Sequence, residues 1–148
     1  GIPNMRTEKG VIIVAHKKPS RENRYLVLNR TKNWEGWELP KGHLEEDDYN
    51  HTVKLELGEE AGISEEQIEN IKDLEHTIEW SFEDGDEKVK RQYKAFLVEV
   101  DSNAIADVDQ NPHDEHEKGF FLSKEDCNGL LTYDEHKEVL EMASEKTE

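Results

Sequence analysis

The sequence is poor in cysteine, in basic residues and in long apolar runs. Its single cysteine, Cys127, excludes an internal disulfide and a thiolate metal cluster. Lys and Arg number 19 against 36 Asp and Glu, and the net charge of −17 opposes broad binding to nucleic-acid phosphates. No apolar stretch approaches the roughly 20 residues of a membrane helix. No cationic leader opens the chain, so nothing suggests a secretory signal, and the single cysteine favours the reducing cytoplasm. We expect no membrane partner, and the acidic charge disfavours nucleic acid.

The 148 residues suit one domain with a buried core. Residues 1–4 precede Met5 and resemble a cloning remnant, so we predict a single domain over residues 5–148. Only 33% of the residues are hydrophobic, but the apolar runs at residues 11–14 and 96–98 can still build a core. The chain contains no internal repeat.

Strand-like and helix-like segments are mixed along the chain, which predicts an α/β (α+β) fold around a mixed sheet. The expected strands are residues 11–15, 25–28, 74–82, 92–100 and 120–122. The first two are expected to form a β-hairpin, and the next two to form another with its tip at residues 83–87. Helical segments are expected at residues 53–61, 123–126 and 133–144. Residues 33–43 are expected to form a loop, because Pro40 and Gly42 oppose a helix there.

The helix at residues 53–61 has the clearest local signals. Its apolar stripe repeats every four residues, at Val53, Leu57 and Ala61. Gly62 suits the position that ends a helix. Candidates for its N-cap are Asp47, Asp48 and Asn50.

Three carboxylates, Glu56, Glu59 and Glu60, share one face of this helix, because residues three and four apart are neighbours. Grouped carboxylates are the ligands that hard divalent cations prefer, although a solvated acidic face would have the same spacing. The preceding turn brings an ammonium group, an imidazole and a glycine backbone from Lys41, His43 and Gly42. This combination favours a site for a magnesium–polyphosphate complex.

Residues 42–63 resemble the Nudix box, G-x5-E-x7-R-E-U-x-E-E-x-G-U with U aliphatic, and residues 56–63 match its end position for position. The resemblance implies an α/β/α sandwich with a central mixed β-sheet. It also implies hydrolysis of a nucleoside diphosphate linked to another group. Three departures stand out: the segment is one residue short, Asp48 replaces the first Glu, and Leu55 replaces an Arg that orients a catalytic carboxylate in the family.

The resemblance extends over about residues 10–143. Residues 34–45 look like the W-x-L-P-K-G-H-x-E run of the asymmetrical dinucleoside tetraphosphate hydrolases. Glu115-His116 followed by residues 120–122 is similar to a later segment of that group, with Phe121 in place of Trp. This subfamily resemblance implies cleavage of a dinucleoside tetraphosphate to ATP and AMP.

The family resemblance also implies roles for individual residues. A site for Mg²⁺ or Mn²⁺ would be formed by Gly42, Glu56, Glu59, Glu60 and Glu115. The catalytic groups would be Glu56, Glu59, Glu115 and Lys41, with the general base either a glutamate of the box or Glu115. A nucleotide also needs an aromatic platform, and the residues expected to bind substrate are Trp34, Lys41, His43, Tyr93, Phe121 and Tyr133. We expect Trp37, Trp80 and Phe82 to belong to the core.

Two further functions stay open at this point. One is another Nudix pyrophosphatase, acting on a nucleotide sugar, a diphosphoinositol polyphosphate or a 5′-end of RNA. The other is a catalytically silent Nudix-like nucleotide sensor, which Leu55, Asp48 and the missing residue favour. The expected partner is a small-molecule nucleotide substrate. The sequence is compatible with a monomer or a homodimer.

Overall fold

The computed structural model describes residues 4–147. Residues 1–3 of the expected cloning remnant lie outside this range, and Asn4 is the first residue of strand β1. The strands are β1 (Asn4–Lys17), β2 (Arg24–Arg30), β3 (Gly36–Glu38), β4 (Lys41–His43), β5 (Ile68–Asp84), β6 (Glu87–Val100) and β7 (His116–Leu122). The helices are α1 (Tyr49–Ala61), α2 (Lys124–Leu130) and α3 (Asp134–Thr147), with short 3₁₀ turns η1 (Glu65–Gln67) and η2 (Val108–Gln110).

The strands form one mixed sheet, as predicted. Its order is β3-β2-β1-β6-β5, with β4 paired to β1 and β7 paired to β2. Strands β1 and β6 run parallel, whereas the other pairs are antiparallel. Strand β1 therefore contacts three other strands and organises the centre of the fold.

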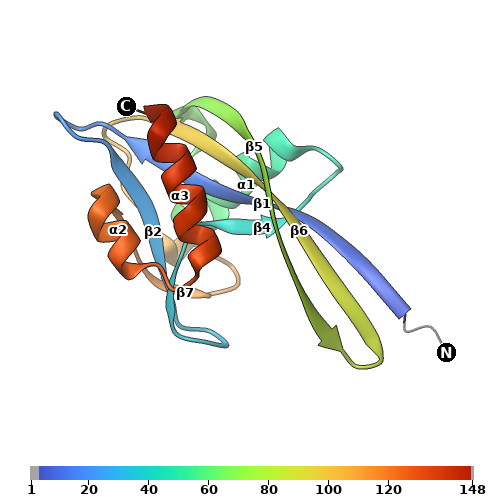
Figure 1. Cartoon of the computed structure of the whole chain (residues 1–148). Helices are drawn as coiled ribbons and strands as arrows, with labels where there is room; N and C mark the ends of the chain where they lie inside the picture. Colours follow the sequence, from blue (N-terminus) through green and yellow to red (C-terminus); the bar gives the residue numbers. More distant parts are fainter. Residues whose placement is uncertain (1–3, 148) are drawn as a thin grey trace.

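Helices cover both faces of the sheet (Figure 1), which makes an α/β/α sandwich. Strand alternation separates the two cores, because successive side chains of a strand point to opposite faces. In β1, Ile12 and Val14 pack in the core that α2 and α3 cover, whereas Val11 and Ile13 pack with α1. In β6, Tyr93, Ala95 and Leu97 alternate along the strand and all lie in the first of these cores.

Two expectations about the first half of the chain need correction. The hairpin of residues 11–15 and 25–28 is paired only at its turn, where His16 is opposite Tyr25. Beyond that point β2 diverges from β1, and residues 10–12 of β1 pair with β4 instead. The β6 partner lies along the opposite edge of β1 and stays paired with it from Asn4 to His16. The expected loop at residues 33–43 contains the short strands β3 and β4, since Pro40 interrupts the pairing without preventing strand structure on either side.

A three-stranded ribbon extends beyond the helices (Figure 1). It consists of the first half of β1 and the paired ends of β5 and β6, which turn at Gly85 with a φ of 63°. The predicted hairpin tip is confirmed, but both strands are longer than expected. Phe82 lies on this ribbon and is 36% exposed beneath the Arg91 guanidinium. Its assignment to the core was wrong because none of the helices within residues 4–147 covers this part of the sheet.

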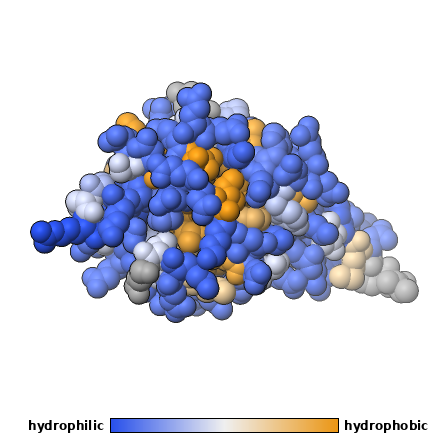
Figure 2. All heavy atoms as spheres, turned by 90° about the horizontal axis from the view of Figure 1, so that it is seen from above, coloured by the Kyte–Doolittle hydropathy of each residue, from blue (hydrophilic) through white to orange (hydrophobic). Residues whose placement is uncertain are grey.

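Figure 2 shows one face of the molecule, on which hydrophilic residues predominate around a smaller group of hydrophobic ones. This agrees with the large acidic excess of the sequence. Within residues 4–147, every helix is too short or too polar to span a bilayer.

Candidate active site

Helix α1 holds its glutamates in a defined orientation. Asp48 caps its N-terminus by accepting a hydrogen bond from the His51 backbone N–H (3.0 Å). Gly62 ends the helix in the left-handed conformation, with a φ of 65°. Gly62 ends the helix as predicted, and Asp48 is one of the three N-cap candidates, but α1 begins at Tyr49, before the expected segment of residues 53–61. The buried stripe of Val53, Leu57 and Ala61 packs on the sheet, which sets the rotation of the helix.

The glutamate face of α1 borders a polar cleft of about 420 Å³ that we call the carboxylate cleft. Its lining residues are Arg30, Asn33, Lys41, Gly42, His43, Glu45, Glu56, Glu59, Glu60, Arg91, Tyr93, Asn111, His113 and Glu115. The structure thus brings together all five residues that were expected to bind metal. Two of the expected substrate-binding residues, His43 and Tyr93, face each other there, with 3.3 Å between the His43 Nδ1 and the Tyr93 hydroxyl.

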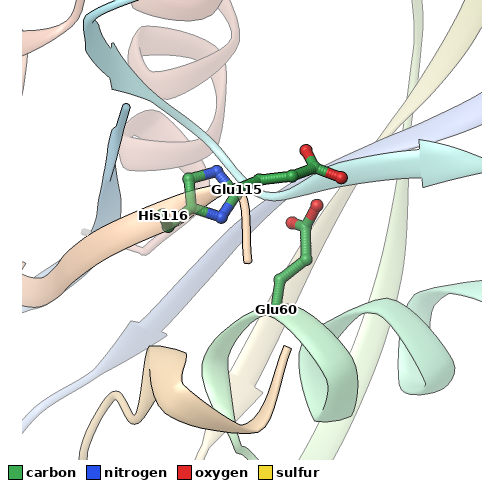
Figure 3. Close-up of side chains that lie close together, drawn as sticks. All are labelled: Glu60, Glu115 and His116. Carbon is green, nitrogen blue, oxygen red and sulfur yellow. The ribbon is translucent and has the colours of Figure 1, made fainter. Parts of the chain in front are cut away.

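Glu60, Glu115 and His116 bring potential metal-ligand atoms close together beside this cleft (Figure 3). One potential ligand atom of each residue lies within 4.8 Å of those of the other two. Glu60 comes from α1, whereas the other two come from the start of β7 and the residue before it. In Figure 3 the carboxylates of Glu60 and Glu115 point toward each other. Segments more than 50 residues apart in the chain therefore supply one set of ligand atoms.

Ionisation of Glu56 and Glu60 is unfavourable in the protein without a bound cation. Burial, together with the charges of Glu59, Glu115 and Glu45, raises the pKa of Glu56 to about 8. Burial and the neighbouring Glu56, Glu38 and Glu115 carboxylates also raise the pKa of Glu60. A backbone N–H of Lys41 donates to Glu60 (3.1 Å) and opposes this shift only in part.

This donor set fits a divalent cation. The ion pairs formed by residues 4–147 leave Glu56 and Glu60 without a Lys or Arg partner. Both carboxylates are nonetheless desolvated, an arrangement that a bound cation would compensate. Carboxylate oxygens are the ligands that Mg²⁺ and Mn²⁺ prefer.

Gly42 leaves room for the end of the Glu56 side chain. A Cβ atom at Gly42 would overlap the Glu56 carboxyl group. The Gly42 carbonyl oxygen also lies where a Cβ at Gly10 would be. The two glycines therefore let β1, β4 and the end of the Glu56 side chain approach closely.

An ion-pair network that the sequence did not indicate lies behind Glu115. Arg30 on β2 contacts the Glu115 carboxylate (2.9 Å) and the fully buried Glu38 (3.3 Å). Glu38 also lies 3.3 Å from the His116 Nε2. Burial opposes the ionisation of Glu38, but the His116 hydrogen bond and the charges of Lys41 and Arg30 outweigh it and lower its pKa.

A second cleft of about 370 Å³ adjoins the carboxylate cleft, and we call it the aromatic cleft. It is lined by Arg30, Asn33, Trp34, Lys41, Ile78, Glu79, Trp80, Arg91, Tyr133, Glu135 and His136. The Trp34 and Tyr133 rings meet edge to face, with their centroids 5.1 Å apart. Trp80 was expected in the core; it packs against the core and also lines this cleft. The sequence did not indicate that Trp80 and Trp34 line the same cleft, because Trp80 lies on β5 and Trp34 lies in the loop after β2.

The two clefts share a cationic boundary formed by Arg30, Lys41 and Arg91, all of which line both. The Arg30 guanidinium lies 5.6 Å from the Trp34 ring. The Lys41 Nζ lies 5.4 Å from the Trp80 ring. Positive charge therefore separates an acidic compartment from an aromatic one.

Phe121 does not lie with the other expected substrate-binding residues. It packs with the core beneath α1, and the Lys17 Nζ lies 4.7 Å from its ring. It lines neither cleft. The reason is strand alternation in β7, which directs neighbouring side chains to opposite faces of the sheet. Its expected contact with substrate is therefore not supported by its position.

The two unusual residues of the Nudix-like segment have clear positions. Asp48 serves as the N-cap of α1 and is absent from the lining of the carboxylate cleft. Leu55 is half-buried on α1, where it provides no charge to orient a carboxylate. Arg30 supplies a guanidinium to the same cleft from β2 instead.

Comparisons with known proteins agree with this geometry. The sequence profile of the NUDIX domain matches residues 7–142. No curated protein matches the chain by sequence. Among solved structures, a binary complex of the Caenorhabditis elegans Ap4A hydrolase is similar, with a TM-score of 0.73 and 20% identity over 95% of this chain and 97% of that one.

Two other solved structures show the same fold. The NUDIX domain of Shewanella oneidensis NrtR, complexed with ADP ribose, has a TM-score of 0.74 and 16% identity, covering 97% of this chain and 90% of that one. The Escherichia coli dihydroneopterin triphosphate pyrophosphohydrolase has a TM-score of 0.69 and 17% identity, covering 90% and 92%. At these identities the likeness concerns the fold.

The α/β/α fold and its acidic cleft are those of a pyrophosphohydrolase. The profile match covers most of the chain, so the protein belongs to the Nudix hydrolase family.

Proposed function

We propose that this protein is a divalent-metal-dependent hydrolase that cleaves a dinucleoside tetraphosphate to ATP and AMP. The observation that carries the proposal is the contact between the carboxylate cleft and the aromatic cleft across Arg30, Lys41 and Arg91. A nucleotide polyphosphate has the complementary arrangement, since its flat base is joined to a long anionic chain.

Binding would use both clefts at once. In the proposed complex one base lies between Trp34 and Trp80, where base–aromatic stacking contributes about 1–3 kcal/mol. Tyr133 extends the same wall and is 42% exposed. The phosphates then cross the cationic boundary, where Lys41 and Arg30 neutralise their charge. The second nucleoside projects from the open side of the carboxylate cleft.

The metal ligands in this proposal are the residues expected from the sequence: Gly42, Glu56, Glu59, Glu60 and Glu115. Bound Mg²⁺ or Mn²⁺ would neutralise charge that develops on the phosphate oxygens. Glu60 is buried and Glu56 is half-buried, and both line the carboxylate cleft, so they suit direct ligation. Glu59 and Glu115 line the same cleft and suit a role nearer to the substrate.

The chain's own groups also position the attacking water. Glu59 or Glu115 would accept its proton, because both carboxylates border the cleft in which a phosphorus atom would lie. Arg30 holds Glu115 by an ion pair of 2.9 Å, which restricts the direction of that carboxylate. His43, whose ring contacts Tyr93, would donate a hydrogen bond to a phosphate oxygen.

The test is incubation of the protein with Mg²⁺ and diadenosine tetraphosphate, followed by chromatography of the products. ATP and AMP in equal amounts would support the proposal. Two equivalents of ADP would exclude the asymmetrical cut. Incubation in ¹⁸O-water then identifies the attacked phosphorus, because the label appears in only one of the two products.

A silent nucleotide sensor remains the second candidate, because Leu55 and Asp48 leave no box arginine and no first box glutamate at the site. Binding detected by calorimetry, with no hydrolysis of dinucleotides, nucleotide sugars or a diphosphoinositol polyphosphate, would favour this function. We place either activity in the cytoplasm, as the cysteine content suggests.

A further inference from the structure

The two ring nitrogens of His136 on α3 have different surroundings. Its side chain is buried, with 4% of the residue exposed. The Nδ1 atom accepts a hydrogen bond from the Leu39 backbone N–H (3.1 Å). Because a backbone N–H can only donate, Nδ1 must carry its lone pair, and the proton of the neutral ring is on Nε2.

The ring stays neutral under ordinary conditions. Burial lowers the pKa of His136 to about 4, with Lys41 adding to the effect and Glu38 opposing it. The imidazole therefore presents one fixed donor, the Nε2–H, over the whole neutral range.

This donor is open to the aromatic cleft. His136 lines that cleft beside Tyr133, whose ring centroid is 5.5 Å away. Within residues 4–147 no acceptor is recorded for the Nε2–H, and Nε2 is not one of the buried atoms that are sealed without a partner. A hydrogen-bond donor held rigidly among aromatic rings suits a flat ligand with an acceptor on its edge.

We propose that His136 determines base specificity by donating its Nε2–H to a ring nitrogen of a purine bound in the aromatic cleft. The inference rests on the proposed function, because it requires a nucleotide in this cleft. Stacking on Trp34 and Trp80 tolerates every base, since each has a π-face. A fixed donor instead selects a base edge that carries an unprotonated nitrogen, and it penalises an analogue that lacks this atom.

The experiment removes the His136 donor and the purine ring nitrogen, first separately and then together. The substrates are diadenosine tetraphosphate and three analogues in which both adenines lack N1, N3 or N7. For the wild-type protein we expect one analogue to have a kcat/KM lower by about 3- to 10-fold, the usual size of one hydrogen bond. In H136N the amide oxygen can still accept from Leu39, but the distant donor is lost. The penalty of that analogue should then disappear.

Y133F is the matched control, because it alters the same cleft and leaves His136 in place. The analogue penalty should persist in this variant. A penalty that is the same in H136N and the wild type, or no penalty for any analogue, would overturn the inference. Failure of the proposed function is a separate result, namely no hydrolysis of the parent dinucleotide by the wild type. In that case the same comparison of proteins and analogues is made with dissociation constants (Kd) measured by calorimetry.

A measurement on the wild-type protein covers the case in which H136N does not fold. With ¹⁵N-histidine labelling, the His136 Nε2–H signal should shift on addition of adenosine 5′-tetraphosphate. The shift should be lost with the one deaza analogue that the kinetics or the calorimetry identify. An unchanged signal in a nucleotide-saturated sample would contradict the inference.

Discussion

The carboxylate cleft and the aromatic cleft lie side by side but are built differently. Three glutamates of the first come from one helix and occupy positions fixed by the helical repeat. The aromatic side chains of the second come from a loop after β2, from β5 and from the segment before α3. The chemistry of the first cleft is therefore local in the chain, whereas the second exists only after the chain has folded.

The comparison suggests a division of roles. The carboxylate cleft concentrates negative charge that is unfavourable without a cation, as the raised pKa of Glu56 shows. The aromatic cleft has walls that can stack on a flat group at low electrostatic cost. Changes in the first should alter the rate of the chemical step, and changes in the second should alter substrate affinity. Four predictions test this separation.

The largest expected effect is that of Glu60→Gln. Removing this metal ligand should lower kcat/KM by about 1,000-fold or more, because a bound metal contributes several kcal/mol to the transition state. The amide can still accept from the Lys41 N–H, so the thermal stability of the metal-free protein should not fall. Steady-state kinetics and calorimetry measure the two effects. Glu66→Gln, an exposed site with the same charge change, is the control, and a near-normal rate for Glu60→Gln would refute the metal assignment.

Trp34→Ala should act on affinity instead. Loss of stacking should raise KM for diadenosine tetraphosphate by about 5- to 150-fold, from the roughly 1–3 kcal/mol of a base–aromatic contact. Hydrolysis of methyl triphosphate, which has no base, should be unaffected by the change. Phe120→Ala removes another exposed aromatic ring outside both clefts and should leave KM unchanged. Equal losses on both substrates would break the proposed division between the clefts.

The pH dependence of stability should report the carboxylate cleft in metal-free protein. Because the folded pKa of Glu56 is raised to about 8, folding favours its protonated form. This stabilisation is complete below the unfolded value of 4.5 and is lost as the pH rises through about 8. The lowered pKa values of His16 and His136 act in the opposite direction, but only below about pH 6.5.

The useful window is therefore pH 6.5 to about 8.5. In EDTA the melting temperature should decrease across this window, and Glu56→Gln should reduce the decrease. Mg²⁺ should raise the melting temperature more at the upper end, where the carboxylates are ionised. A melting temperature that rises with pH in EDTA would contradict the raised pKa.

The smallest expected effect is that of Gly58→Ala in the middle of α1. A Cβ there would be 3.7 Å from its nearest neighbour, the Ile63 carbonyl oxygen, which is ordinary contact. We expect a gain of about 1 kcal/mol in unfolding free energy, measured by urea denaturation, with both clefts unchanged. Gly62→Ala should instead destabilise the protein, because its φ of 65° is strained for alanine and its Cβ would be 2.8 Å from the Asp107 carbonyl.

Much of the carboxylate cleft could be predicted from the sequence. The terminal Gly62 of α1 was identified, and the N-cap was narrowed to three candidates that include Asp48, because capping depends on neighbouring residues. The face containing Glu56, Glu59 and Glu60 followed from helical spacing. The network of Arg30, Glu38 and Glu115 was missed, because its members are joined only by pairing between β2, β3 and β7.

The aromatic cleft shows the opposite case. Trp34 and Tyr133 were suspected from their residue type, but nothing local distinguished them from Phe121, which faces the other core. Trp80 was assigned to the core alone, although it also forms a wall of the cleft. An aromatic residue is equally suited to a core and to a binding surface, so residue type does not decide between them.

By itself, the sequence determined the helix, its ends and the alignment of its glutamates, because the helical repeat and capping act over a few neighbouring residues. Only the tertiary structure decided which cations border those glutamates, which aromatic rings line the neighbouring cleft and which nitrogen of His136 carries the proton. Those features depend on strand pairing and helix packing between residues far apart in the chain, where no short-range rule applies.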